Sequence, residues 1–289
     1  MNKLFGRHEP LPAVVEQART SLSKLAETQP DLRDLSATTA ALLRQMYLEV
    51  PVVVWSFTGE QVARKLEGGV PLLRGEHLVL DGKLLQKQFE QLGVVMETQG
   101  HPAAKPLTVA VRQGQFDVLQ AAQAILLGDP TTVVTQADAQ ALDAELTATL
   151  LRLTLFPLLE QISSAARPLR PDDTWSNGYC PTCGAWPLLG EYRGLEQKRW
   201  LRCGLCADEW PLDRLMCFAC GSRVYSDLHY LEVAGEELKQ RVHTCEQCHS
   251  YIKQISTLDR LDSPALLVAD VATLHLDLIA MERAYSQPQ

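Results

Sequence analysis

The chain has 289 residues, of which 46% are hydrophobic and 21% are charged, and its formal net charge is −8 with neutral histidines. These values are typical of a globular protein of about two domains, and the acidic balance argues against a general binder of nucleic acid or membrane surfaces. No apolar run approaches the roughly 20 residues needed to cross a bilayer, so we expect no membrane insertion. The first ten residues lack the apolar region of a signal peptide, which favours a cytoplasmic location.

Residues 1–170 are predicted to form a helical domain. Apolar residues recur at helical spacing in several segments, and turn signals rich in glycine and proline separate these segments. The expected helices cover residues 12–25, 31–48, 83–95, 115–127 and a segment that begins near residue 138. Pro157 lies in the last of these and should kink or break it, because proline has no N–H to donate. We attribute the apolar stripes to core packing between helices.

The composition changes at residues 168–173, a predicted linker whose two prolines and two aspartates disfavour both helix and central strand. Two small β modules rich in cysteine and aromatic residues are expected to follow, at residues 171–212 and 213–260. Residues 261–289 should supply a C-terminal helix, from about Val268 to Ala284, that packs back on the body. The predicted fold class is therefore α+β.

All eight cysteines lie between Cys180 and Cys248, in four C-x-x-C pairs. A C-x-x-C turn places two thiolates at the spacing that one tetrahedral metal ion requires, and two such turns complete a four-sulfur shell. We predict that the pairs combine in sequence order, the alternative being a cross-braced arrangement in which alternate pairs share an ion. The predicted metal ligands are Cys180, Cys183, Cys203 and Cys206 at the first site, and Cys217, Cys220, Cys245 and Cys248 at the second.

Each of the two longer intervals between cysteine pairs can form a β-hairpin that brings two turns together. The strand candidates are residues 186–192 and 198–201 in the first interval, and residues 225–233 and 238–243 in the second. Gly184 and Gly221 directly follow the second cysteine of their pairs, where glycine lets the backbone turn tightly and point N–H groups at the sulfurs. Ala207 and His249 take this place in the other two pairs, so these turns are expected to lack the device.

Four thiolates suit zinc or a single iron ion, and the spacing of the cysteines does not separate the two metals. A shell of four cysteines leaves no open coordination position, so a structural role is expected at one site at least. A tetrathiolate iron can also pass an electron, which keeps a rubredoxin-like electron-transfer protein as an alternative. Iron–sulfur clusters fit two hairpins less well, and a dithiol catalyst would need one reactive pair rather than four matched pairs.

The sequence contains no Ser-His-Asp arrangement and no glycine-rich phosphate loop that would indicate catalysis, so we do not expect an enzyme. Arg199, Trp200 and Arg202 could stack on bases, which would suit a zinc-ribbon protein that binds nucleic acid. Residues 171–260, however, hold 10 Lys+Arg and 13 Asp+Glu. This acidic balance favours a small aromatic core around the metal sites over a nucleic-acid interface.

The order of these motifs resembles one known family. The motifs are CPTCG at residues 180–184, RCGLC at 202–206 followed by EW at 209–210, CFAC at 217–220, and CEQC at 245–248 followed by YIK at 251–253. With Asp270 and the helix at residues 274–278, they resemble the formate dehydrogenase accessory protein family (FdhE). The resemblance covers most of the chain, and all eight cysteines match the family's positions.

The resemblance implies a cytoplasmic maturation factor for a molybdenum- or tungsten-dependent, membrane-associated formate dehydrogenase. Such a factor would bind the catalytic subunit before export, as a chaperone or proofreading protein without enzymatic activity. Family members are regarded as rubredoxin-like iron binders. The expected cofactors are therefore two mononuclear tetrathiolate metal ions, with iron preferred by resemblance and zinc possible by chemistry.

Overall fold

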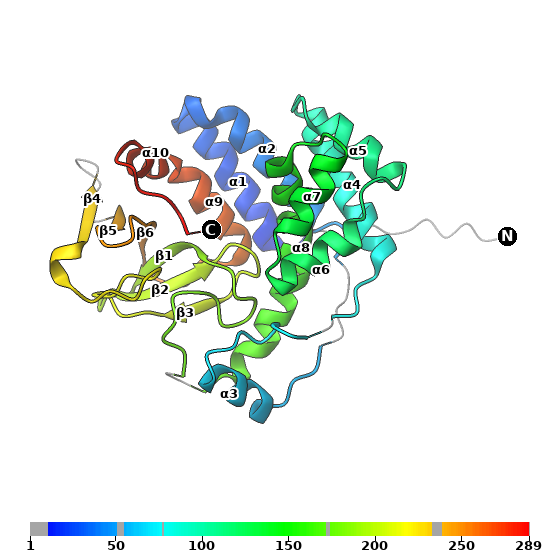
Figure 1. Ribbon diagram of the computed structural model, residues 1–289. Coiled ribbons are helices and arrows are strands. Elements are labelled where there is room, and N and C mark those ends of the chain that lie inside the picture. Colours follow the sequence, from blue (N-terminus) through cyan, green and yellow to red (C-terminus); the bar gives the residue numbers. More distant parts are fainter. Residues whose placement is uncertain (1–10, 51–54, 77, 172–173, 233–238, 289) are drawn as a thin grey trace.

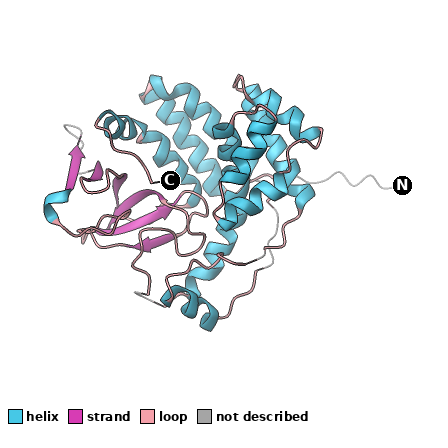
Figure 2. Cartoon of the chain, in the orientation of Figure 1, coloured by secondary structure: helices cyan, strands magenta, loops and turns pink. Residues whose placement is uncertain are grey.

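The computed structural model describes residues 11–50, 55–76, 78–171, 174–232 and 239–288. Helices from the first part of the chain gather on one side of the molecule, and all the described strands lie together on the other (Figures 1 and 2). Two helices from the C-terminal part lie beside the sheet, where one of them contacts the first two helices of the chain. The architecture is thus α+β, as predicted.

Eight α-helices are described before the sheet. They are α1 Ala13–Thr28, α2 Arg33–Met46, α3 Gly59–Glu67, α4 Gly82–Thr98, α5 Ala104–Arg112, α6 Val118–Leu127, α7 Thr131–Ala139 and α8 Ala144–Ala166, with short 3-10 turns at η1 Pro30–Leu32 and η2 Arg167–Leu169. Aspartate side chains cap three of them, because Asp81, Asp117 and Asp143 accept N–H groups at the starts of α4, α6 and α8. Apolar faces from these helices share one core, in which Phe89 stacks on Phe116 at a centroid distance of 5.8 Å.

The helical part departs from the prediction at two points. Of the kink or break expected at Pro157, the break is absent, since α8 continues through Pro157 to Ala166. Leu155, Phe156 and Leu158 around it are buried, and this packing outweighs a cost of about 3 kcal/mol for an internal proline. The sequence patterns also missed α3, α5 and α7, which have nine residues each and are shorter than the window in which helical periodicity is read.

Six strands form one sheet in the order β3-β2-β1-β6-β5-β4. Their bounds are β1 Pro187–Arg193, β2 Lys198–Cys203, β3 Glu209–Pro211, β4 Leu228–Glu232, β5 Gln240–Cys245 and β6 Tyr251–Thr257. The two predicted hairpins are present as β1–β2 and β4–β5. The β1–β6 pair, in which Leu189 lies opposite Lys253, is parallel and joins the two halves, whereas the other pairs are antiparallel.

The single C-terminal helix expected from Val268 to Ala284 is instead two helices, α9 Ser263–Ala272 and α10 Leu274–Glu282, with a bend of 50° between them. The bend brings carboxylates from both helices to one buried cation, since Lys253 Nζ lies 2.5 Å from Asp270 Oδ1 and 2.7 Å from Asp277 Oδ2. α9 packs on α1 and α2, and α10 packs on β5 and β6.

Beyond the bend, Leu276 and Ala280 of α10 are buried, whereas Leu278 and Met281 are 55% and 61% exposed. Among the described residues, no single helix is long and apolar enough to span a membrane. Taken together as a bent pair, α9 and α10 are long and apolar enough, judged by length and composition alone.

Candidate metal centres

The structure gathers the eight cysteines into two groups of four, and within each group the sulfurs all lie within 4.8 Å of one another. The first group is Cys180, Cys183, Cys203 and Cys206, and the second is Cys217, Cys220, Cys245 and Cys248. The pairs therefore combine in sequence order, and not in the cross-braced arrangement. All eight thiols are free, and each group could hold one metal ion.

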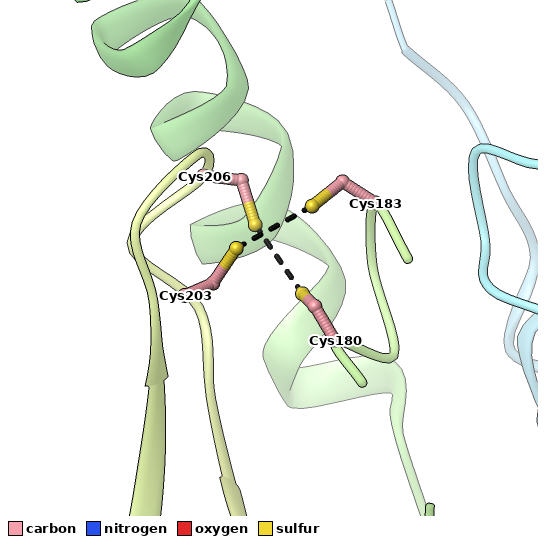
Figure 3. Close-up of side chains that lie close together, drawn as sticks. All are labelled: Cys180, Cys183, Cys203 and Cys206. Atoms are coloured by element: carbon pink, nitrogen blue, oxygen red, sulfur yellow. Dashed lines mark hydrogen bonds between the residues drawn. The ribbon is translucent and has the colours of Figure 1, made fainter. Parts of the chain in front are cut away.

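At the first site two C-x-x-C turns face each other and direct their sulfurs at a shared point (Figure 3). The Sγ atoms of Cys180 and Cys206 are 3.5 Å apart, and those of Cys183 and Cys203 are 3.4 Å apart. Four sulfurs held about 2.3 Å from a tetrahedral zinc ion would be separated by about 3.8 Å, whereas a disulfide would bring two of them to about 2.05 Å. The separations are thus close to those of a four-sulfur metal shell.

All four C-x-x-C turns share one backbone arrangement. The N–H of the first cysteine donates to the carbonyl five residues later, and its own carbonyl accepts the N–H four residues later. In the first turn these bonds join Cys180 to Ala185 and Gly184, each at 2.9 Å. The repetition explains why four short segments, distant in sequence, present their sulfurs alike.

The residue four positions after the first cysteine has positive φ in every turn, with values of 81° at Gly184, 55° at Ala207, 74° at Gly221 and 53° at His249. The expectation that the turns at Ala207 and His249 lack the tight conformation is therefore wrong. A left-handed conformation costs a residue with a side chain about 1–2 kcal/mol. The two backbone hydrogen bonds of each turn outweigh this cost, so glycine is not required.

The first site is enclosed by the helical part of the chain, and its four sulfurs are buried. The backbone N–H groups of Leu72 and Leu73, in the segment after α3, donate to the carbonyls of Pro181 and Thr182 at 2.8 and 2.9 Å. On the other side, the Ser163 hydroxyl of α8 donates to the carbonyl of Cys206 at 2.7 Å. Two separate elements of the helical part of the chain thus hold the two turns of this site.

A buried carboxylate, Asp208, ties the first site to the predicted linker. Asp208 accepts hydrogen bonds from the Thr182 hydroxyl at 2.6 Å and from the Arg170 guanidinium at 2.8 and 3.0 Å, and its Oδ2 lies 4.0 Å from the Cys180 sulfur. Asp208 is fully buried, so these hydrogen bonds take the place of the water that its carboxylate would otherwise contact. Neither Asp208 nor Arg170 was singled out from the sequence, in which the two lie 38 residues apart.

The thiols of the first site affect one another's ionisation. Burial raises the pKa of Cys180 and Cys206 well above the ordinary value. Burial also acts to raise the pKa of Cys203, but hydrogen bonds from the three neighbouring thiols and the Leu205 N–H lower it well below that value. A bound dication would allow all four sulfurs to ionise, with release of protons.

The second site has the same ligand set in a different setting. The Sγ atoms of Cys217 and Cys248 are 3.7 Å apart, and so are those of Cys220 and Cys245. Cys217 and Cys245 are buried, whereas Cys220 and Cys248 are exposed. The Ser250 hydroxyl lies 3.0 Å from the Cys248 sulfur and 3.6 Å from that of Cys217. The second site is therefore less enclosed than the first.

The extended segment after α10 covers the last turn of the second site. The Ser286 N–H donates to the carbonyl of His249 at 2.9 Å, and the Tyr251 N–H donates to the carbonyl of Ser286 at 3.2 Å. The Tyr285 hydroxyl also donates to the Glu246 carboxylate. Among the described residues, no helix before the sheet donates a recorded hydrogen bond to this site, in contrast to the first.

The basic residues considered for nucleic-acid binding are mostly inside the sheet. Arg202 is fully buried, pairs with Glu191 and donates to the carbonyl of Leu261 at 2.9 Å. Arg199 is 2% exposed and donates to the carbonyl of Met216 at 2.9 Å. These guanidinium groups brace the sheet and are not placed to reach a base, which leaves the half-buried Trp200 as the accessible member of the set.

Together, the fold and the cysteine groups define a class: an α+β protein that carries two tetracysteine sites in tandem along one sheet. Residues 215–289 match the family described as FdhE, C-terminal domain. The protein FdhE homolog of Stutzerimonas stutzeri is 35% identical over 186 residues, which cover 63% of this chain and 52% of that protein. The chain thus aligns with about half the length of that relative.

Two comparisons extend over nearly the whole chain. The protein FdhE homolog of Pseudomonas aeruginosa is 28% identical over 304 residues, which cover 96% of this chain and 89% of that protein. The crystal structure of the FdhE protein from Pseudomonas aeruginosa matches with a TM-score of 0.61 at 23% identity, over 96% of this chain and 95% of that one, and supports the fold. The resemblance to the FdhE family is thereby confirmed.

Proposed function

We propose that this protein is an accessory factor for formate dehydrogenase, which binds the catalytic subunit in the cytoplasm and assists its maturation before export. The observation that carries the proposal is the similarity to an FdhE homolog over 96% of the chain, together with the ordered cysteine pairs that the family resemblance rests on. In this role the protein acts by binding, as a chaperone does, and catalyses no reaction of its own.

We further propose that each cysteine group holds one metal ion. The ligands would be the four cysteines of each group, which offer closely spaced sulfurs on matching turns. Iron is preferred by family resemblance, and zinc suits the same donors. A bound ion supplies folding free energy, because it joins segments that the small sheet alone would hold weakly. The first ion would fasten the sheet to the helical domain, and the second would close the far half.

The experiment is co-purification from cells that produce formate dehydrogenase. The tagged protein is expected to retain the catalytic subunit, which is identified by mass spectrometry. A Cys203→Ser variant should lose the subunit, because it opens the first site between the helical domain and the sheet. Arg64→Gln is the matched control, since the side chain of Arg64 forms an exposed pair with Glu60 on α3 and no other recorded pair with a described residue. Absence of the catalytic subunit from the wild-type eluate would contradict the proposal.

A second candidate, electron transfer, is favoured by the exposure of Cys220 and Cys248 at the second site. An iron held there would lie close enough to solvent for a redox partner to approach. Protein from native cells would then show thiolate-to-iron absorption that bleaches reversibly on reduction. Colourless protein that carries only zinc would exclude this candidate and leave the accessory role intact.

A further inference from the structure

After α10 the chain turns back toward the sheet and the helical part of the molecule (Figure 1). We call residues 285–288 the tail. Residues 285 and 286 are bonded to the last C-x-x-C turn of the second cysteine site, and residues 287 and 288 line a cavity beside the first site. The tail thus connects the surroundings of the two sites, and the proposed accessory function assigns it no role.

The first half of the tail is fixed through main-chain groups. Ser286 donates its N–H to the carbonyl of His249 at 2.9 Å, and its own carbonyl accepts the N–H of Tyr251 at 3.2 Å. The same serine forms a parallel β-bridge with Ser250. The tail therefore continues the sheet beside the start of β6, and it holds the segment that presents the sulfur of Cys248.

An ion in the second site would hold the same segment from the other side, because it would join Cys245 and Cys248 to Cys217 and Cys220. His249, whose carbonyl accepts the bond from the tail, has a φ of 53°, a conformation that is disfavoured for a residue with a side chain. The ion and the tail would thus stabilise one and the same conformation of this turn. Two partners that favour one conformation strengthen each other's binding, and the effect is reciprocal.

The second half of the tail forms a wall of the cavity. Its volume is about 320 Å³, which falls in the range of small-molecule sites. Much of the lining is apolar and comes from α6, α7 and the turns of the first site, as with Ile125, Val133 and Leu205. Cys183, a predicted ligand of the first site, lines the cavity as well. Departure of the tail would therefore open an apolar surface next to the first site.

The tail is held by few contacts for a segment that closes a cavity. Tyr285 and Pro288 are half-buried, whereas Ser286 and Gln287 are exposed. The hydrogen bonds to the last turn therefore provide much of its attachment. A segment held in this way detaches at a lower free energy than the core unfolds, and loss of one hydrogen bond shifts the equilibrium by up to about tenfold.

We propose that the tail is a lid over this cavity and that the second cysteine site controls it. With an ion in the second site, the turn at His249 is held and the tail closes the cavity. When that ion leaves, the turn loosens, the tail detaches and the apolar walls become accessible. The inference rests on the metal binding proposed above and is independent of the accessory role.

The first test measures the effect of the tail on the ion. Ser286→Pro removes the N–H that His249 accepts, and Ser286→Ala is the matched control, because it keeps this N–H and removes a hydroxyl that forms no recorded hydrogen bond with a described residue. In the protein with both ions bound, Ser286→Pro should release the second ion to EDTA about tenfold faster than the wild type, with the first ion unaffected. Ser286→Ala should match the wild type. A stop codon at Tyr285 should accelerate release at least as much as Ser286→Pro.

The outcomes of this test separate the two proposals. Normal metal content with unchanged release from both Ser286→Pro and the truncated protein would overturn the lid alone. Equal acceleration in Ser286→Ala would overturn the role of the main-chain bond. A wild-type protein with no ion at the second site would overturn the metal proposal and the lid together.

The second test measures the effect of the ion on the cavity. The dye 8-anilinonaphthalene-1-sulfonate fluoresces on exposed apolar surface. Its fluorescence should rise at least about threefold with Cys220→Ser, which lacks the second ion, and also with the truncated protein while both ions are bound. The truncated protein keeps the test decisive if Cys220→Ser folds poorly.

One further change locates the dye. Val134 lines the cavity and is 46% exposed, so Val134→Gln should fold normally and should remove most of the added fluorescence in the truncated protein. Fluorescence of the folded truncated protein equal to that of the wild type would overturn the proposal. An increase that Val134→Gln leaves unchanged would place the exposed surface elsewhere and would overturn it as well.

Discussion

The two cysteine sites have the same ligands and the same backbone turns but different surroundings. The first lies under α8 and the segment after α3, with all four cysteines buried. The second lies at the far half of the sheet, with Cys220 and Cys248 exposed. The turn sequence therefore fixes how sulfurs are presented, and the tertiary contacts fix how firmly a bound ion is enclosed. We expect the first site to determine stability and the second to exchange its ion.

The largest expected difference comes from removing one ligand at each site. Cys203→Ser should lower the metal content by one ion of two and lower the melting temperature by at least about 10 °C, because it also loosens the contact between the helices and the sheet. Cys220→Ser should also lose one ion, with a clearly smaller change in melting temperature. Metal analysis and thermal unfolding measure both. Equal melting temperatures for the two variants would remove the distinction between the sites.

The next largest effect is expected at the carboxylate behind the first site. Asp208→Asn should destabilise the fold by about 3–5 kcal/mol, since it leaves the Arg170 guanidinium partly buried without its counter-ion. Asp213→Asn is the matched control at the second half, where the pair with Arg223 is exposed and worth less than about 1 kcal/mol. Chemical denaturation gives both values. A cost below about 1 kcal/mol for Asp208→Asn would show that the linker is not anchored through this pair.

Removal of metal should separate the sites by rate. A chelator such as EDTA, added to the protein with both ions bound, is expected to withdraw the second ion at least about tenfold faster than the first, because the second site includes the exposed residues Cys220 and Cys248. The metal content of the protein, measured at intervals after the chelator is added, should fall in two phases of one ion each. A Cys220→Ser protein should lack the fast phase, whereas a single phase in the wild type would contradict the difference in enclosure.

The smallest effect concerns the glycines that follow the second cysteines. Gly184→Ala should cost more than Gly221→Ala, because an added methyl would approach Pro71 Cγ and Arg74 Nε at 3.1 Å, whereas nothing lies within 4 Å at Gly221. The second change should cost only the strain of positive φ, about 1 kcal/mol. Denaturation midpoints compare the two variants. A larger loss at Gly221 would mean that the second turn is the more constrained one.

The features that could be predicted from the sequence are those set by nearby residues. The C-x-x-C spacing and the hairpin intervals sufficed to group the sulfurs, because each hairpin closes over a short stretch of chain. The β1–β6 pairing could not be predicted, since it joins strands about sixty residues apart and strand periodicity does not specify a neighbour. The break between α9 and α10 was missed for a related reason, because Lys253, which both helices reach, lies in another element.

The anchoring of the first site was likewise beyond the sequence patterns. Residues 168–173 have the composition of a linker, yet Arg170 within them is fixed to Asp208. The composition of a segment reflects its local conformational preference. It does not reveal an ion pair with a residue that is distant in the sequence. The positive φ at Ala207 and His249 was not predicted either, because the backbone hydrogen bonds within each turn outweigh the preference for glycine.

The parallel junction between β1 and β6 affects how this protein can be divided for experiments. A fragment cut at residues 215–289, the portion that matches the FdhE C-terminal domain, would retain β4, β5 and β6 but lose β1. The backbone groups of β6 from Lys253 to Thr257 would then lie unpaired at an exposed edge of the sheet. Such an edge can pair with a strand from a second copy of the fragment. Self-association of such a fragment would reflect the missing strand, and would say nothing about the oligomeric state of the intact chain.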